Sequence, residues 1–165
     1  MQGYGTNEEF ITWVEGQGLS LPDDANVTAL RAVGSQYLDA AYAMRLQCSK
    51  KTGGFEQDLE FPRTGHTVNG VTLPSNLIPK SWILASYRAA YLNATQAGWS
   101  TNANDPTRIT KREKVDVLER EYFAPSDTAN LGSASGLAAD ALIDAMVSTL
   151  LCPTGRDFNS LFMVI

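Results

Sequence analysis

The residues that could carry chemistry are few in this chain of 165 residues. His66 is the only histidine, so a histidine pair or a multi-histidine metal site is impossible. The stretch GSASG at 132–136 has the outline of a nucleophile elbow, but that motif needs serine at its centre, where the chain has Ala134. No histidine follows it to act as a base. We therefore expect no enzyme, no catalytic residue and no cofactor.

Metal ligands are also poorly arranged. Glu56, Asp58 and Glu60 alternate with bulky apolar residues and could bind a divalent cation, but the glycine and final glutamate of an EF-hand are missing. A solvated edge is the better interpretation. Cys48 and Cys152 lie far apart and match no metal spacing. We expect no metal site, and folding in a reducing cytosol.

Basic residues gather in the middle of the chain, although the net charge is −5. Residues 48–114 hold nine bases and five acids, between two acidic stretches. A DNA-facing or inter-subunit patch is predicted from Lys50, Lys51, Arg108, Lys111, Arg112 and Lys114. Arg63, Lys80 and Arg88 would extend it, beside the aromatic residues Trp82, Tyr87 and Trp99. The spacing is not diagnostic, because basic clusters in an acidic protein more often pair with acids or stay solvated.

Lysines also precede the glycines in SKKTGG at 49–54. A phosphate-cradling loop has the reverse order, so this stretch is interpreted as a flexible loop.

Apolar periodicity predicts a mainly α fold, a bundle of about four helices. The first begins at a capping box formed by Thr6 and Glu9 and ends at Gly16. Others are expected at about 26–46, with a small-residue notch at Gly34, and at about 79–98. The fourth covers 133–152. Its buried side should contain Leu137, Ala138, Ala141, Leu142, Ala145, Met146, Thr149 and Leu150.

Between the second and third helices lies LEFPRTGHTVNGVTLPSNLIP at 59–79, with three prolines and little helical signal. Asn69-Gly70 predicts a small β-hairpin. We expect a stiff extended arm that reaches a neighbour and loses little conformational entropy on docking. The alternative is a wrap packed on its own bundle through Leu59, Phe61, Val71 and Leu73, and both can hold. A second extended segment is expected near 108–123, where helical and strand patterns compete and β-branched residues favour the strand.

Residues 154–165 are interpreted as a C-terminal docking tail that follows a helical-bundle domain at 1–153. The tail is crowded with apolar residues: Phe158, Leu161, Phe162, Met163, Val164 and Ile165. Burying such side chains is worth about 1.5–3 kcal/mol each, so the tail should dock. We favour a portal or neighbouring subunit as its partner, and its own bundle is the alternative.

Five stretches occur in order across about residues 7–152: ALRAVGSQYLDAAY, LEFPRTG, NGVTLPSNLIPKSWILASYRAAYLNA, REKVDVLEREY and LIDAMVSTLL. Together they resemble the small head-tail connector (adaptor) proteins of tailed bacteriophages, whose members are often labelled DnaT-like single-stranded DNA binding protein. The turn at 61–65 and Ile78-Pro79 are the most specific parts. The resemblance implies a helical bundle with a small β element, assembled as a twelve-fold ring beneath the portal. The loop TQAGWSTNANDPT and the tail depart from the pattern.

We therefore expect a structural virion protein of the head-tail interface, made in the host cytoplasm. Its partners would be copies of itself, the portal protein, the next connector, stopper or tail-completion protein, and DNA that passes without sequence-specific binding. No membrane is expected. Arg63, His66 and the apolar tail are the predicted subunit or portal interface, although Arg63 could instead reach a carbonyl inside its own fold.

Two other functions stay open. One is a single-stranded DNA-binding or replication accessory protein. The other is a small regulatory or antitoxin-like host binder, which would need a partner that the sequence does not show.

Overall fold

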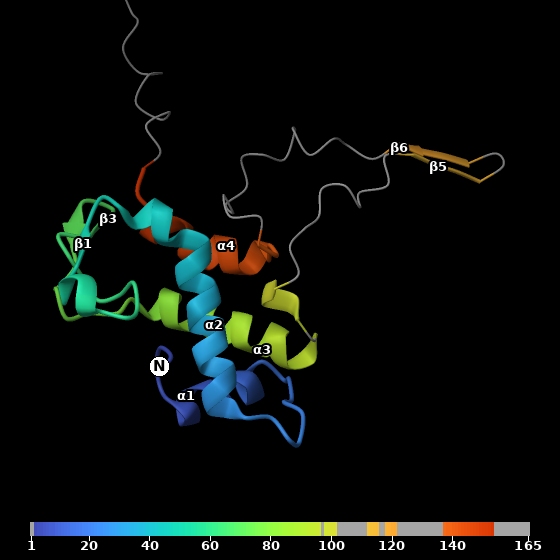
Figure 1. Ribbon diagram of the computed structural model, residues 1–165, viewed down its shortest axis with the longest axis horizontal. Coiled ribbons are helices and arrows are strands. Elements are labelled where there is room, and N and C mark those ends of the chain that lie inside the picture. Colours follow the sequence, from blue (N-terminus) through green and yellow to red (C-terminus); the bar gives the residue numbers. More distant parts are fainter. Residues whose placement is uncertain (1, 97, 102–111, 116–117, 122–136, 154–165) are drawn as a thin grey trace, which may run out of the picture.

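The computed structural model describes residues 2–96, 98–101, 112–115, 118–121 and 137–153, of which 112–115 and 118–121 are described by their backbone alone. The predicted site residues Arg108 and Lys111 and the tail at 154–165 lie outside the described residues. Figure 1 shows α2 and α3 crossing in the middle, with α1 near one end of α2 and α4 near the other.

Helix α1 (Asn7–Gly16) begins where the sequence predicts. Thr6 Oγ1 accepts a hydrogen bond from the amide of Glu9, and the Glu9 carboxylate accepts one from the amide of Thr6. This reciprocal pair satisfies two amide donors that a first helical turn leaves free. Phe10 and Val14, on one face of α1, are buried in a small cluster with Tyr87 of α3.

Helices α2 (Val27–Tyr42) and α3 (Lys80–Thr95) form the centre of the core. They approach closely at Gly34, where an added Cβ atom would lie 2.4 Å from the carbonyl oxygen of Ser86. The predicted notch is therefore confirmed. Leu38 of α2 and Trp82, Ala85 and Ala89 of α3 are completely buried around this crossing. A short 3₁₀ helix, η1 (Ala43–Leu46), continues α2.

Helix α4 (Ala141–Val147) and the 3₁₀ helix η6 (Ser148–Leu150) are shorter than predicted, and the predicted buried side was wrong in part. The buried residues are Ala138, Ile143, Val147 and Leu150, whereas Leu142 is 48 % exposed. Ala141, Ala145 and Thr149 are exposed too. The helix starts at residue 141 because Asp140 caps it by accepting hydrogen bonds from two amides of its first turn. Its buried face is decided by packing, since Ile143 and Val147, with Leu150 of η6, join the core cluster formed by residues of α2 and α3.

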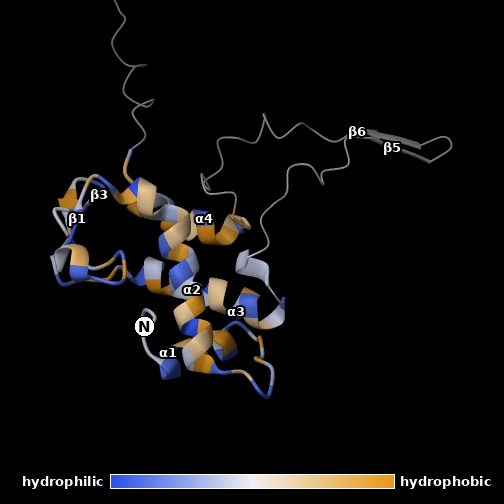
Figure 2. Ribbon diagram, in the orientation of Figure 1, coloured by the Kyte–Doolittle hydropathy of each residue, from blue (hydrophilic) through white to orange (hydrophobic). Residues whose placement is uncertain are grey.

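The crossing segment, residues 47–79, contains two pairs of antiparallel strands. β1 (Lys50–Lys51) pairs with β2 (Arg63–Thr64), and the 3₁₀ helix η2 (Gly54–Glu56) lies between them. β3 (Thr67–Val68) pairs with β4 (Val71–Thr72) across Asn69-Gly70, both in the left-handed region, so the predicted hairpin is confirmed. Figure 2 shows mostly hydrophilic stretches here, interrupted by single hydrophobic residues.

Part of the predicted wrap is present. Phe61, which precedes Pro62 through a cis peptide bond, is buried with its ring centroid 4.9 Å from that of Trp82. Leu59 packs against the same core while half-buried. Val71 is 67 % exposed and does not take part.

The second extended segment is a strand pair, as the β-branched residues indicated. β5 (Arg112–Val115) and β6 (Leu118–Glu121) are antiparallel, and their register sets each base opposite an acid: Arg112 and Glu121, Glu113 and Arg120, Lys114 and Glu119. A third 3₁₀ helix, η3 (Trp99–Thr101), follows α3. The described part of the chain is thus mainly α with small antiparallel strand pairs, while a single four-helix bundle stays a prediction.

Cys48 and Cys152 form a disulfide bond that the sequence analysis did not predict. Their Cα atoms are 5.8 Å apart, although 104 residues separate them in the sequence. The amide of Cys152 also donates to the carbonyl of Arg45. The end of η6 is thereby joined to the beginning of the crossing segment. Within the described ranges, no helix has the length and apolar character needed to cross a membrane.

Candidate functional site

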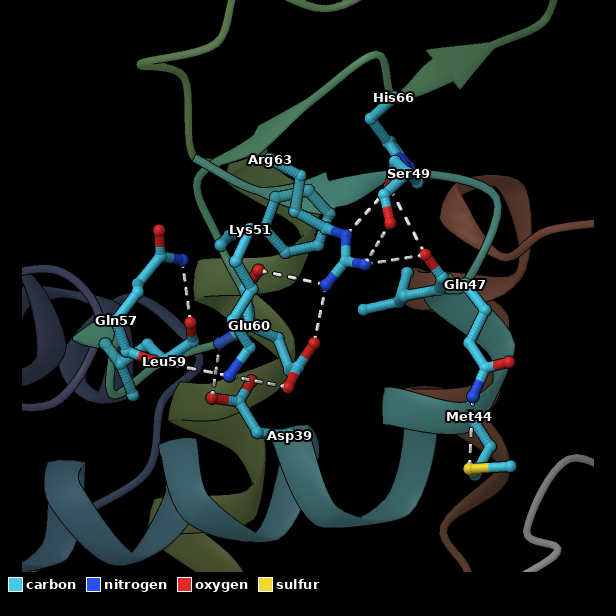
Figure 3. A network of polar contacts seen from close by, with 12 residues as sticks. Asp39, Met44, Gln47, Ser49, Lys51, Gln57, Leu59, Glu60, Arg63 and His66 are labelled. Atoms are coloured by element: carbon cyan, nitrogen blue, oxygen red, sulfur yellow. Dashed lines mark hydrogen bonds and ion pairs between the residues drawn. The ribbon is translucent and has the colours of Figure 1, made fainter. Parts of the chain in front are cut away.

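A polar hub formed by Ser49, Glu60, Arg63 and His66 holds the crossing segment together (Figure 3). The guanidinium of Arg63 donates to the carbonyls of Leu46 at 2.8 Å and Ser49 at 2.6 Å. It also donates to Ser49 Oγ at 2.7 Å and to the Glu60 carboxylate at 2.5 Å. Only 5 % of Arg63 is exposed. The sequence left open whether Arg63 contacts a neighbouring subunit or a carbonyl of its own fold. In the structure it contacts carbonyls of its own fold.

His66 is also an internal residue, with 1 % of its surface exposed. Its Nδ1 atom lies 2.9 Å from Ser49 Oγ, and the edge of its ring meets the ring of Phe61. Burial lowers the pKa of His66, and the nearby positive charge of Arg63 lowers it further. Both residues are thus accounted for by contacts within one chain. Their part in a subunit or portal interface stays a prediction.

The hub positions the Phe55 loop, residues 50–57. Lys51 Nζ lies 3.0 Å from the Glu60 carboxylate and donates to the Gln57 carbonyl. The side chain of Gln57 accepts from the amide of Gly53 and donates to the carbonyls of Leu59 and Pro62. Glycines and lysines suggested a flexible loop, but these hydrogen bonds fix its shape.

Phe55, in η2 within this loop, is fully exposed, with 107 % of its reference surface accessible. Its ring borders a pocket of about 610 Å³ that is also lined by Lys50, Lys51, Gly54, Glu60 and Arg63. Lys50 is exposed, whereas Lys51 is engaged by Glu60. An exposed aromatic ring on an ordered loop, beside a lysine, can stack on a nucleic acid base or anchor in an apolar pocket of another protein.

A second surface, the α1–α3 groove, has a volume of about 590 Å³. Its lining residues are Glu8, Glu9, Thr12, Trp13, Lys80, Ile83, Leu84 and Tyr87. Glu8 and Glu9 are exposed, and the Tyr87 hydroxyl donates to the Glu9 carboxylate at 3.2 Å. Burial raises the pKa of Tyr87 to about 12, and the charge of Glu9 contributes. The groove therefore combines an aromatic and aliphatic floor with an acidic rim.

The predicted basic patch is not continuous among the described side chains. Lys50 and Lys51 line the pocket at Phe55, Lys80 lines the α1–α3 groove, and Arg88 pairs with Asp140 at 3.1 Å. Arg112 and Lys114 lie on β5, each opposite a glutamate in the register.

The aromatic part of the patch prediction was wrong for two residues. Trp82 and Tyr87 are 0 % and 2 % exposed, so neither ring is available to stack on a base. Trp99 is half-buried against Tyr37. Among the aromatic residues that the structure describes, the exposed ring is that of Phe55, for which the sequence holds no signal.

The carboxylates considered for a cation do not converge. Glu56 and Asp58 are exposed, while Glu60 is occupied by Lys51 and Arg63. In the part of the chain that the structure describes, no three potential ligands are close enough together to hold a metal ion.

Comparison with known families finds a match over almost the whole chain. A family model described as "Putative DnaT-like ssDNA binding protein" matches residues 1–164. The chain therefore belongs to this family. The description names binding of single-stranded DNA and does not mention a head-tail connector. No curated protein and no solved structure matches the chain at a significant level.

Proposed function

We propose that this protein is a structural subunit of a tailed-bacteriophage virion, a head-tail connector that forms a ring below the portal and extends the DNA channel. The five ordered sequence stretches that resemble such connectors support this proposal. In this function DNA passes the ring without being read, so neither a catalytic group nor a sequence-specific contact is needed.

The observation that carries the proposal is the rigidity of the crossing segment together with the apolar side chains it exposes. Phe55, Val71 and Leu77 are 107, 67 and 44 % exposed. Phe55 lies on the loop between the paired strands β1 and β2, Val71 lies on β4, and the amide of Leu77 donates to the Pro74 carbonyl. Exposed apolar groups on an ordered backbone favour docking to protein, because little conformational entropy remains to be lost.

Charge gives further support. Four of the described bases are engaged by acceptors of their own chain: Arg31, Lys51, Arg63 and Arg88. Affinity for nucleic acid rises with the number of phosphates that lysine and arginine neutralise. A net charge of −5 also opposes the approach of a polyanion.

The second candidate is a single-stranded DNA-binding protein, and the family description supports it more directly than it supports the connector. One structural observation favours it: Phe55 and Lys50 border the same pocket. Stacking of a base on an aromatic side chain contributes about 1–3 kcal/mol, and a nearby lysine can neutralise a phosphate.

Assembly and DNA titration separate the two. We expect the free protein to be monomeric at micromolar concentration and to form a ring on purified portal, seen by electron microscopy. We expect no tight binding of an oligo-dT strand at a salt concentration of about 0.15 M. Tight oligo-dT binding with steep salt dependence, and no association with portal, would overturn the connector proposal in favour of the second candidate.

A further inference from the structure

We infer that the Phe55 loop of one copy docks in the α1–α3 groove of a second copy of this chain. This inference deepens the proposed function and rests on it, because a ring requires a contact between two different faces of the same subunit. Neighbouring subunits would bind through the Phe55 loop of one copy and the α1–α3 groove of the next.

The Phe55 loop presents an exposed aromatic ring on an ordered backbone. The phenyl ring of Phe55 is fully exposed, and Lys50 beside it is exposed as well. The loop is braced by Gln57 and by the Lys51–Glu60 ion pair. Interface anchors are typically aromatic residues that enter a pocket on the partner.

The receiving face has the complementary chemistry. Trp13, Ile83 and Leu84 are half-buried and line the floor together with the buried ring of Tyr87. The carboxylates of Glu8 and Glu9 line the rim, where a lysine that flanks the inserted ring could pair with them. Lys80 is the one base among the groove's lining residues. An apolar ring with a flanking cation thus matches an apolar floor with flanking anions.

One copy cannot make this contact with itself. Figure 1 shows β1, which carries the start of the Phe55 loop, apart from α1. The pairing of β1 with β2 and the bond from Cys48 to Cys152 hold the loop where it is. A contact between two different patches of identical chains is head-to-tail, and such contacts form closed rings when the rotation between neighbours closes.

Cross-linking tests the contact directly. Full-length protein carries the photoreactive residue p-benzoylphenylalanine in place of Phe55, and it is mixed in equal amounts with ¹⁵N-labelled protein at high concentration. We expect mixed-isotope cross-links to peptides that contain residues 8–13 or 80–87. Cross-links confined to one isotope, or mixed-isotope cross-links only to other peptides, would overturn the inference.

Charge reversal sharpens the test. Lys50→Glu and Glu8→Lys should each lower the cross-link yield several-fold, and mixing the two variants should restore it between them. Glu15→Lys is the matched control, because it makes the same charge change on α1 outside the groove. An equal loss in the control, or no recovery in the mixture, would contradict pairing across the groove rim.

The inference and the proposed function can fail separately. If Phe55→Ala protein still forms rings on portal, the docking contact is wrong and the connector stands. If copies cross-link as expected but never associate with portal, the contact stands and the connector is wrong. If added oligo-dT captures the photoreactive residue and abolishes the cross-link between copies, both are overturned in favour of single-stranded DNA binding.

Discussion

The α2–α3 crossing and the crossing segment are held in place by different interactions. Around α2 and α3, apolar side chains such as Leu38 and Trp82 are completely buried, and Gly34 lets the two backbones touch. In the crossing segment Phe61 is buried in the core, whereas Leu59, Val68 and Ile78 are only partly buried against it. Its strands are two residues long, too short to be stable alone.

Hydrogen bonds from buried polar side chains stabilise the crossing segment, which its short strands alone cannot do. Arg63 donates to carbonyls of the segment and of η1, and the Tyr4 hydroxyl accepts from the amide of Phe61. Asp39 of α2 accepts from the amide of Glu60. Buried backbone groups need such partners, since leaving one unpaired costs about 1–3 kcal/mol. A segment with little regular structure can thus be ordered by a few buried polar side chains.

The largest effect should come from Arg63→Met, which keeps a long apolar stem and removes the guanidinium. It removes one donor from the Leu46 carbonyl, one from the Ser49 carbonyl and the buried partner of the Glu60 carboxylate, and we expect a loss of about 3–5 kcal/mol in the free energy of unfolding. Urea denaturation is the measurement. Arg88→Met is the control, because its ion pair with Asp140 is partly exposed and should be worth no more than about 1 kcal/mol. Equal losses in the two variants would contradict the importance of the polar hub.

Opening the disulfide should have the next largest effect. Because the bond closes a loop of 104 residues, the Cys48→Ser/Cys152→Ser variant should lose about 2–5 kcal/mol of unfolding free energy. Dithiothreitol should destabilise the native protein by a similar amount. It should leave the double variant unchanged, since the chain has no other cysteine. Identical melting temperatures with and without reductant would rule out a stabilising bond.

The carboxyl group of Asp39 should make stability depend on pH. Burial raises its pKa to about 6, while the Tyr4 hydroxyl and the Glu60 amide donate to it and oppose part of the shift. The folded state then keeps this proton to a higher pH than the unfolded chain does. The free energy of unfolding should therefore fall as pH rises from about 4 to about 6, by up to about 3 kcal/mol.

Asp39→Asn should flatten this part of the pH profile, measured by urea denaturation at each pH. His66 has the opposite effect on stability. Its pKa is lowered in the folded state, so the unfolded chain takes up a proton first as pH falls below about 6.5, and the free energy of unfolding falls with it. An Asp39→Asn profile as steep as that of the native protein between these pH values would sink the assignment.

The smallest expected change concerns the helical core. Gly34→Ala should cost about 1–3 kcal/mol, because its Cβ atom would press on the backbone of α3. Gly16→Ala is the matched control: a Cβ atom there meets nothing within 4 Å. That variant should be neutral, or more stable by up to about 1 kcal/mol. Equal effects in thermal melts would show that the helices can separate to admit a methyl group.

Local signals in the sequence were sufficient for some elements. The Thr6–Glu9 capping box and the Asn69-Gly70 turn each act within a few residues, so their effects could be predicted without the fold. The buried side of α4 could not be predicted, because packing against residues of α2 and α3, distant in sequence, decides which of its residues are buried. Asp140, which caps α4, also pairs with Arg88 of α3.

The candidate site depended still more on distant contacts. The sequence offered two directions for Arg63, and the choice is made by carbonyls of residues 46 and 49, which only the folded chain brings near. The exposure of Phe55 follows from how Gln57 and Glu60 brace its loop. A disulfide between residues 104 positions apart likewise has no local signature.

The Cys48–Cys152 bond also changes the path that mechanical load takes through the molecule. A pull on the chain beyond residue 153, resisted on the N-terminal side of Cys48, reaches Cys152 first, and the covalent bond passes it to Cys48 and on toward η1 and α2. Helix α4 then does not carry this force, and its buried residues Ile143 and Val147 stay packed in the core. In a reduced protein the same pull would act on the end of η6, where only non-covalent contacts resist it.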